Sequence, residues 1–215
     1  MPHLSEIWPL FELTLRTPRL VLRPVRDEDL AGLADAAVAG IHEPGVMPFG
    51  VPWTDAPTAE LVRNLAQYHW TLRTKVARGD WHIAFAILLD GRVIGSQDLS
   101  AASFSTTKTV ETGSWLTRDA QGTGIGKEMR AAILMFAFDH LGAEYAETSA
   151  AEWNDASIGV SRAMGYIPNG VHRASRREGQ VNDENHYRLS SQSFARPAWA
   201  LIVNGVEPVR RQLLG

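Results

Sequence analysis

One stretch decides the fold of this 215-residue chain: Leu116-Thr117-Arg118-Asp119-Ala120-Gln121-Gly122-Thr123-Gly124-Ile125-Gly126-Lys127. An apolar run ends before it and a run with helical spacing follows it, so we predict a glycine-rich turn between a strand and a helix. The first N–H groups of a helix lack intrahelical partners and carry part of the helix dipole. Glycines let a ligand approach these groups. The turn therefore predicts an anion site, to which Lys127 adds a charge unless it faces water.

Two well-known phosphate loops do not match this stretch. A Walker A loop needs a glycine five residues before Gly126 and a serine or threonine after Lys127, but Gln121 and Glu128 stand there. A dinucleotide fingerprint that starts at Gly122 needs its third glycine where Lys127 stands. The pattern that is present is Gln-x-x-Gly-x-Gly. A glycine-rich helix start without a ligand is the alternative interpretation.

The rest of the chain predicts an α/β (α+β) domain. Asp90-Gly91 between two apolar runs indicates a tight hairpin. The order of elements favours a mixed sheet with helices packed on it rather than a doubly wound repeat. The expected strands are 13–25, 81–89, 92–99, 109–117, 144–150, 166–174 and 182–189, and the expected helices are 27–39, 55–78, 123–141 and 154–165.

Cap and stripe residues define the expected helices further. Asp27 is the predicted N-cap of the first helix, and Thr54 or Asp55 that of the second. The residues expected to form the buried stripe of the second helix are Leu61, Leu65, Tyr68, Leu72 and Val76. We expect one domain over residues 1–193 and a C-terminal extension over 194–215.

Composition excludes several classes of protein. The net charge of -3 argues against nucleic acid as the main partner. The absence of cysteine excludes disulfides, thiolate metal sites and a cysteine nucleophile. The seven histidines show no ligand spacing, so no metal is expected. Met1 to Glu12 lacks signal-peptide features and no apolar run has the length of a membrane helix, so a cytoplasmic protein without a membrane partner is expected.

Several motifs in the right order resemble the GNAT superfamily of acyl-CoA-dependent N-acyltransferases. Gln121–Gly126 is similar to its acyl-CoA signature, and Asn154–Tyr166 to its second signature. Glu111–Leu116 resembles the Glu-x-Gly-x-Trp-Leu strand of the RimJ/RimL branch, as do Leu15–Arg23 and Tyr187–Leu189. The resemblance implies a GNAT fold, with a mostly antiparallel sheet that splays at the acyl-CoA site.

The resemblance also implies roles for single residues. Ser157 would be the general acid for the leaving thiolate, although it can equally be a second cap residue of its helix. Asn154 would bind the pantetheine arm, alongside a capping role, and Arg162 would reach the CoA phosphates unless it is simply exposed. The cofactor-binding set is Trp115, Leu116, Thr117, Gln121, Gly122, Thr123, Gly124, Ile125, Gly126, Lys127, Asn154, Ser157 and Arg162.

A general base is sought near the acyl site, because the attacking amine must be neutral. Glu111 lies on the strand that leads to that site and shares a face with Trp115. The alternative interpretation of Glu111 is an ordinary charged residue near a strand start. Glu152 is a second candidate, and an amine that arrives neutral needs no base.

The expected activity is transfer of an acetyl or succinyl group from CoA to a protein N-terminus, a lysine or a small amine. Succinyl-CoA is an expected donor because the loop His42–Trp53 is similar to one in an actinobacterial RimJ/RimL-like group. That group includes an enzyme that uses succinyl-CoA. A non-catalytic acyl-CoA sensor is the alternative function. Within residues 194–215, the apolar run at 199–203 is expected to pair with a partner chain in a homo-oligomer or to fold back on its own sheet.

Overall fold

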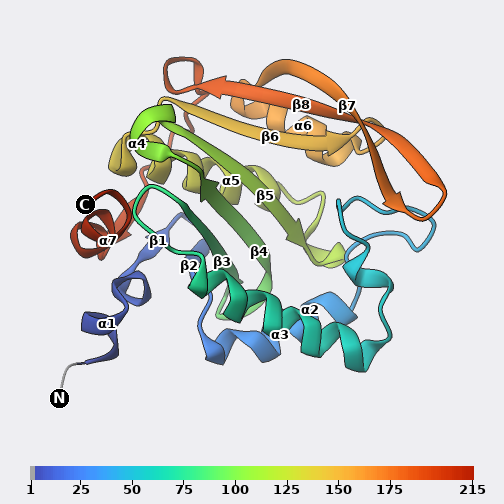
Figure 1. Cartoon of the computed structure of the whole chain (residues 1–215), viewed down its shortest axis with the longest axis horizontal. Helices are drawn as coiled ribbons and strands as arrows, with labels where there is room; N and C mark the ends of the chain where they lie inside the picture. The colour runs from blue at the N-terminus through green and yellow to red at the C-terminus, as the bar shows by residue number, and fades with distance from the viewer. Residues whose placement is uncertain (1–2) are drawn as a thin grey trace.

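The computed structural model describes residues 3–215, so Met1 and Pro2 of the N-terminal segment lie outside the described residues. One sheet runs through the protein in the order β7-β8-β6-β5-β4-β3-β2-β1-β9 (Figure 1). Neighbouring strands pair antiparallel, except that β5 and β6 are parallel. The strands are β1 Thr14–Arg16, β2 Leu20–Pro24, β3 Trp81–Leu89, β4 Arg92–Ala101, β5 Thr109–Leu116, β6 Tyr145–Ala151, β7 Ile167–Arg177, β8 Gln180–Ser190 and β9 Ile202–Asn204.

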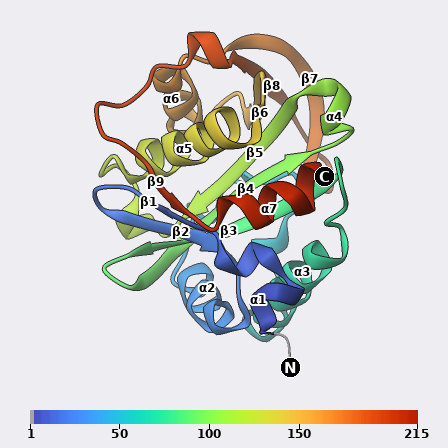
Figure 2. The same ribbon diagram turned by 90° about the vertical axis from the view of Figure 1, so that its left-hand side faces the viewer.

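Helices cover both faces of this sheet (Figure 2). The α-helices are α1 Leu4–Ile7, α2 Leu30–Val38, α3 Thr58–Thr74, α4 Phe104–Thr107, α5 Ile125–Met135, α6 Asp155–Met164 and α7 Val206–Leu214. Short 3-10 turns lie at η1 Pro9–Glu12, η2 Asp27–Asp29, η3 Trp53–Asp55, η4 Arg118–Ala120 and η6 Ser191–Ser193, and a π-helical turn at η5 Phe136–Leu141.

Two apolar cores result from this layering. The larger core lies between the sheet and α5, and includes Phe85, Ile133 and Phe136, all fully buried. The smaller core lies under α2 and α3, and includes Leu33 and Leu65. Burial of these side chains is the main force that holds the helices on the sheet.

The hairpin expected at Asp90-Gly91 is confirmed. It joins β3 to β4, and both residues have positive φ, 49° and 79°. Such a pair of left-handed residues matches the twist of the two strands, which explains the glycine at the second position.

The strand expected over 13–25 is two strands, β1 and β2, that pair with each other. Leu15 stands opposite Leu22 in their register. Between them Thr17 closes a turn, because its hydroxyl accepts a hydrogen bond from the Leu20 N–H at 2.9 Å. A side-chain hydroxyl that bonds a backbone N–H in this way ends a strand, and the pattern of apolar residues does not reveal it.

Two expectations about the helix ends are wrong. Asp27 does not cap α2. Asp29 holds this end instead, accepting from the Arg26 N–H at 3.0 Å. Thr54 and Asp55 do not cap α3, because they belong to η3 and the helix starts after Pro57. The helix expected over 123–141 is confirmed as α5, which the π-helical turn η5 continues to Leu141.

The buried stripe of α3 also differs in part. Leu61, Leu65 and Leu72 are buried as expected, but Tyr68 is 45% exposed and His69 is buried in its place. Val76 lies beyond the end of the helix at Thr74. The Tyr68 hydroxyl donates to Asp98 on β4, a contact between distant segments that helical spacing cannot show.

The C-terminal extension folds back on its own chain. β9 pairs antiparallel with β1, with Leu15 opposite Val203. Gly205 follows with φ of 74°, and a Cβ there would lie 2.4 Å from the Glu12 carbonyl oxygen, so no larger residue fits. α7 then places Val209 and Leu213 in the larger core. A homo-oligomer stays a prediction, since a single chain does not test it.

Replacing Leu213 with alanine tests how far the extension stabilises the domain. The side chain is fully buried, so Leu213→Ala should lower the free energy of unfolding by about 2–5 kcal/mol through lost burial and a cavity. Arg211→Ala, on the exposed face of α7, is the control and should change stability by less than about 0.5 kcal/mol. Urea denaturation measures both, and equal effects would contradict the packing described here.

Candidate functional site

The glycine-rich turn lies at the end of β5 and leads into α5, as the sequence predicts. Gly122 and Gly124 have φ of 72° and 84°, and Gly124 is the N-cap of α5. This left-handed backbone turns the chain so that the first N–H groups of α5 face outward. Residues 121–124 are exposed. The local geometry is that of an anion site at a helix N-terminus.

Gln121 holds the turn in place with its side chain. Its Nε2 donates to the carbonyl oxygens of Leu116 at 2.9 Å and Ile41 at 2.7 Å. These contacts tie the turn to the end of β5 and to the segment after α2. Because both amide hydrogens are used, the side chain positions the turn, and the backbone is the part that faces outward.

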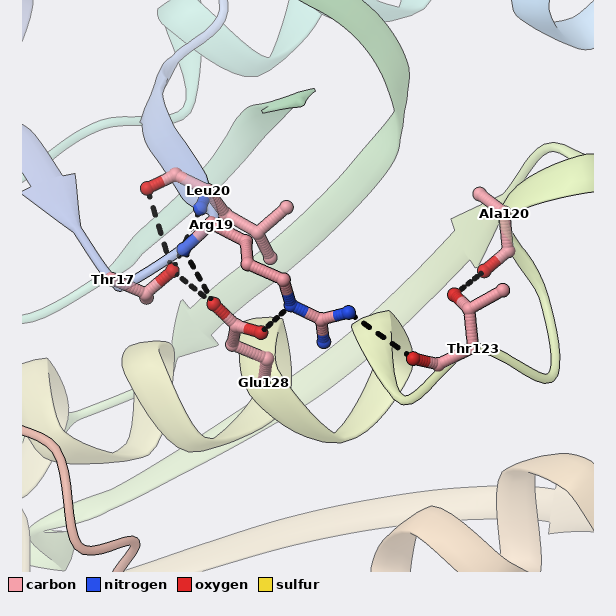
Figure 3. A network of polar contacts seen from close by, with 6 residues as sticks. All are labelled: Thr17, Arg19, Leu20, Ala120, Thr123 and Glu128. Atoms are coloured by element: carbon pink, nitrogen blue, oxygen red, sulfur yellow. Dashed lines mark hydrogen bonds and ion pairs between the residues drawn. The ribbon is translucent and has the colours of Figure 1, made fainter. Parts of the chain in front are cut away.

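An ion pair with a buried carboxylate lies behind the turn (Figure 3). Glu128, in the first turn of α5, accepts from Arg19 Nε at 2.6 Å and from the Thr17 hydroxyl at 2.5 Å. Arg19 Nη1 also donates to the Thr123 carbonyl oxygen at 3.2 Å. Arg19 therefore braces the turn from the β1–β2 side, and its half-exposed guanidinium brings a positive charge beside Gly124.

The ionised form of Glu128 is favoured by these contacts. Burial alone would raise the pKa of Glu128, but the hydrogen bonds from Thr17 and Arg19 and the charge of Arg19 outweigh it and hold the pKa below its ordinary value of 4.5. The pair is therefore ionised at neutral pH.

The remaining residues of the turn have separate roles. Thr123 donates its hydroxyl to the Ala120 carbonyl oxygen at 2.7 Å. Ile125 is buried, and Gly126 lies against Val160 of α6. Lys127 is exposed.

β5 and β6 diverge next to this turn. They pair only at three positions, of which Glu111 opposite Glu147 is the last. β5 continues to Leu116 with hydrogen bonds to β4 alone, and β6 continues to Ala151 with pairs to β8 alone. Beyond Glu111, the edge of β5 that faces away from β4 therefore has no strand partner among the described residues, and an extended ligand can pair with it as a strand would.

Two threonines fasten the point of divergence. Thr148 donates its hydroxyl to the Thr112 carbonyl oxygen at 2.9 Å, and Thr112 donates to the Glu147 carbonyl oxygen at 3.3 Å. These bonds replace the backbone ladder just where it stops. Thr117, at the far end of β5, is buried and bonds its N–H to the Ile94 carbonyl oxygen at 2.9 Å.

The N-terminus of α6 lies at the same edge of the sheet. Parallel strands end at one edge, so the helices that follow β5 and β6 both begin there. Asn154 caps α6, with Oδ1 accepting from the Ser157 N–H at 3.1 Å. Ser157 is half-buried, and no described residue is hydrogen-bonded to its hydroxyl. Arg162 is exposed in the last turn of α6.

A polar cleft of about 260 Å³ lies on the sheet face at the point of divergence. One row of registered residues crosses it, from His82 on β3 through Ser100 and Glu111 to Glu147 on β6. Register partners point to the same face, so these side chains line one floor. The other lining residues are Asp98, Thr112, Gly113, Thr148, Ser149 and His186.

Asp98 is the centre of a small cluster in this cleft. His82 Nε2 lies 3.3 Å from Asp98 Oδ2, and Tyr68 donates to the same oxygen at 3.4 Å. Burial first, and then the charge of Asp98, raise the pKa of Tyr68, so the phenol keeps its proton. Burial lowers the pKa of the neighbouring His69 to about 4, which leaves that ring neutral.

A loop and a hairpin close the site from outside. Trp53 packs its ring 5.8 Å from that of Trp115, which fixes the loop after α2 on β5. At the tip of the β7–β8 hairpin, Arg177 forms two 2.7 Å hydrogen bonds with the Asp55 carboxylate. Figure 1 shows this hairpin curling toward the loop.

The family follows from a profile match over this framework. A profile described as an acetyltransferase (GNAT) domain matches residues 19–167, from β2 to the start of β7. The chain belongs to this family. The GNAT resemblance noted in the sequence motifs is thereby confirmed, and so is the mostly antiparallel sheet flanked by helices.

Solved structures of GNAT proteins share this fold. RimJ of Mycobacterium smegmatis in complex with CoA-disulfide superimposes with a TM-score of 0.73 at 21% identity, covering 89% of this chain and 92% of RimJ. RimL, a ribosomal L7/L12 α-N-protein acetyltransferase in complex with CoA, gives 0.66 at 18% identity, with 81% and 95% covered. A GNAT-family acetyltransferase from Bacillus anthracis gives 0.63 at 14%, with 83% and 99% covered. The first two agree with the RimJ/RimL branch expected from the motifs.

Some residues of this GNAT site were missed by sequence reasoning. Arg19 was noted only within a motif, because its place beside the turn depends on the β1–β2 pairing. His82 and Asp98 show no spacing motif, and only the β3–β4–β5 register brings them into the cleft with Glu111. Strand alternation was the one available signal, and it cannot give register.

No metal or membrane feature appears in the part of the chain that the structure describes. Residues 3–215 contain no group of three or more potential ligands that could hold a metal ion. No helix among them has the length and apolar character required to cross a membrane.

The Glu128–Arg19 pair predicts a pH-dependent stability. The ionised Glu128 carboxylate stabilises the folded state, and this contribution is fully present above about pH 4.5, the ordinary pKa of the group. It is lost as the pH falls through the lower pKa that Glu128 has in the folded protein. Glu128→Gln should therefore cost about 1–3 kcal/mol at pH 7, and its difference from wild type should shrink at lower pH. Thermal unfolding between pH 7 and 3 measures this. The exposed Glu144→Gln is the control, and a difference that is independent of pH would refute the role of the charge.

Proposed function

We propose that this GNAT protein transfers an acyl group from acyl-CoA to a primary amine. The observation that carries the proposal is the divergence of β5 from β6 directly beside the glycine-rich helix start. A pyrophosphate fits the outward N–H groups of that start, and a pantetheine arm fits the unpaired edge of β5. RimJ and RimL, which share the fold, are in complex with CoA-disulfide and with CoA in their own structures, which supports the same ligand here.

The proposed CoA contacts follow the path of the ligand. The turn from Gln121 to Lys127 holds the pyrophosphate, with Arg19 as an added cation beside it. The backbone of Trp115, Leu116 and Thr117 bonds the pantetheine arm, and Asn154 contacts it from α6 while capping that helix. Arg162, exposed on the same helix, reaches the phosphates from the side. Acetyl-CoA and succinyl-CoA are both proposed donors.

Two side chains are proposed to move protons. Glu111 lines the cleft and takes a proton from the acceptor ammonium through a water, so that the nitrogen attacks the thioester carbonyl carbon. As the C–N bond forms and the C–S bond breaks, Ser157 gives its proton to the CoA sulfur and is reprotonated by the second proton that the attacking nitrogen loses. The position of Ser157 beside the divergence, with a hydroxyl that no described residue occupies, supports this role.

The cleft supports a cationic acceptor. Its lining includes the carboxylates of Asp98 and Glu111, and that of Glu147, with which Arg188 pairs at 2.7 Å. A protein N-terminus, a lysine side chain or a small amine is protonated at neutral pH and is attracted by such a lining. The proposed acceptors are therefore amines of this kind.

A non-catalytic acyl-CoA sensor is the alternative function. It shares the CoA contacts but needs no proton-transfer groups. Release of free CoA thiol from acyl-CoA, dependent on an added amine, separates the two, since a sensor releases none with any acceptor.

The CoA site is tested by ligand-induced stabilisation. Acetyl-CoA, succinyl-CoA or CoA at 100 times its Kd should stabilise the protein by about 2.7 kcal/mol. Gly124→Ala should abolish this shift, because it distorts the left-handed helix start. Gly142→Ala is the matched control, since Gly142 has a similar φ of 76° but lies at the far end of α5 and η5. Absence of a shift with all three ligands on the wild type would refute the proposed function.

Catalysis is tested by removing the two proton-transfer groups separately. Ser157→Ala keeps the backbone N–H that Asn154 caps, so it should fold and bind CoA while kcat falls about 10²-fold or more. Glu111→Gln should lower kcat by a similar factor, with less effect at high pH where the amine is already neutral. Ser161→Ala, which removes a hydroxyl bonded inside α6, is the control. Unchanged steady-state rates in the first two variants would show that these groups do not transfer protons.

A further inference from the structure

Arg130 places a buried guanidinium across the gap between β5 and β6. It lies on α5 and is 3% exposed. Nη1 donates to the Thr148 hydroxyl on β6 and Nη2 to the Ser114 hydroxyl on β5, both at 3.3 Å. Ser114 and Thr148 follow the last paired residues of their strands, Glu111 and Glu147. The guanidinium therefore spans the strands where they have begun to separate.

This cation has no counter-charge among residues 3–215. Other arginines of the described chain pair with carboxylates, but no described carboxylate lies within 4.0 Å of Arg130. The Nε of Arg130 also has no hydrogen-bond partner among the described residues. The Tyr166 hydroxyl is a further neutral partner of the guanidinium, because burial raises its pKa more than Arg130 lowers it. The other deeply buried arginine, Arg176, does have a carboxylate, Glu184, at 3.3 Å. A guanidinium cannot lose its charge at physiological pH, and an unpaired buried charge costs several kcal/mol.

Arg130 also lies at the level of the donor's reactive end. It is on the same helix as the turn, and from Gly124 to Arg130 the helix rises roughly 9 Å. A pantetheine arm that starts at the turn and follows β5 toward Glu111 runs along this stretch of α5. On this proposed path its thioester would come to the region of Ser114, and the acyl group would enter the gap that the guanidinium spans.

We propose that Arg130 recognises an acyl group that ends in a carboxylate, so that the preferred donors are CoA monothioesters of short dicarboxylic acids. The inference rests on the proposed function and names the donor class for the same site. Nε and the N–H groups not used by Ser114 and Thr148 form a fork that a carboxylate accepts in two hydrogen bonds. The carboxylate takes no part in the transfer, in which the C–S bond breaks and the C–N bond forms as described above.

Two other roles for Arg130 predict different results. A guanidinium that only props the strands apart would affect all donors equally, as would one that polarises the thioester carbonyl. Only recognition of the terminal carboxylate separates donors by charge. The decisive comparison is therefore between donors of equal carbon number that differ in this group, succinyl-CoA and butyryl-CoA.

Titration calorimetry with succinyl-CoA, butyryl-CoA and CoA tests the proposal without an acceptor amine. The wild type should bind succinyl-CoA about 10–100-fold more tightly than butyryl-CoA, as expected for a charge-assisted pair. Arg130→Met should remove this preference while leaving the Kd of CoA within about threefold. Arg130→Lys keeps the charge without the fork and should retain part of the preference.

Arg176→Met is the matched control for loss of a buried arginine. It removes the guanidinium that pairs with Glu184, away from the gap, and should leave the ratio of the two Kd values unchanged. Arg130→Met should be as stable as wild type or more stable, because it removes an unpaired charge.

The outcomes are distinct. Equal affinity of the wild type for succinyl-CoA and butyryl-CoA overturns the proposal, and this result needs no variant. Equal losses for both donors in Arg130→Met also overturn it, in favour of a prop or a carbonyl contact. Failure of CoA itself to bind the wild type would instead overturn the proposed function. If Arg130→Met does not fold, the wild-type ratio and Arg130→Lys decide the question.

Discussion

The parallel pairing of β5 and β6 ends at Glu111 and Glu147, and the candidate site depends on this early end. Each strand has a full set of partners on its other side, so the two can separate without unravelling the sheet. Because they are parallel, the turn before α5 and the N-terminus of α6 lie at one edge. The early end of the β5–β6 pairing thus produces three features together: a gap beside unpaired backbone, two helix N-termini at one edge, and a polar floor.

Charge is distributed unevenly around that gap. Behind the turn, Glu128 pairs with Arg19, and Arg19 braces Thr123. On the floor, Asp98 and Glu111 form an acidic lining suited to a cationic amine, while Glu147 is paired with Arg188. Inside the gap, Arg130 is positive and no described carboxylate is paired with it. A donor whose acyl group ends in an anion would meet Arg130 in the gap. A cationic acceptor would meet the carboxylates on the floor of the cleft.

Long-range contacts build the outer wall of the site. Arg177 and Asp55 join the β7–β8 hairpin to the loop after α2, and Trp53 rests on Trp115. The Arg177–Asp55 contact is not local, and it explains one difference from the sequence-based expectations, as the contact of Tyr68 with Asp98 explains another. Asp55 is bound to Arg177 instead of capping α3, and Tyr68 turns to Asp98 instead of joining the stripe of that helix.

The sequence by itself determined the order of strands and helices, the hairpin at Asp90-Gly91, the glycine-rich helix start and the cap at Asn154, because each depends on residues close together in the chain. It also carried the motifs that identify the family. Only the tertiary structure decided the register that sets His82, Asp98 and Glu111 in one cleft, and the separation of β5 from β6 around Arg130. Register and burial arise from pairing between distant segments, and no local pattern encodes which side chains will face one another.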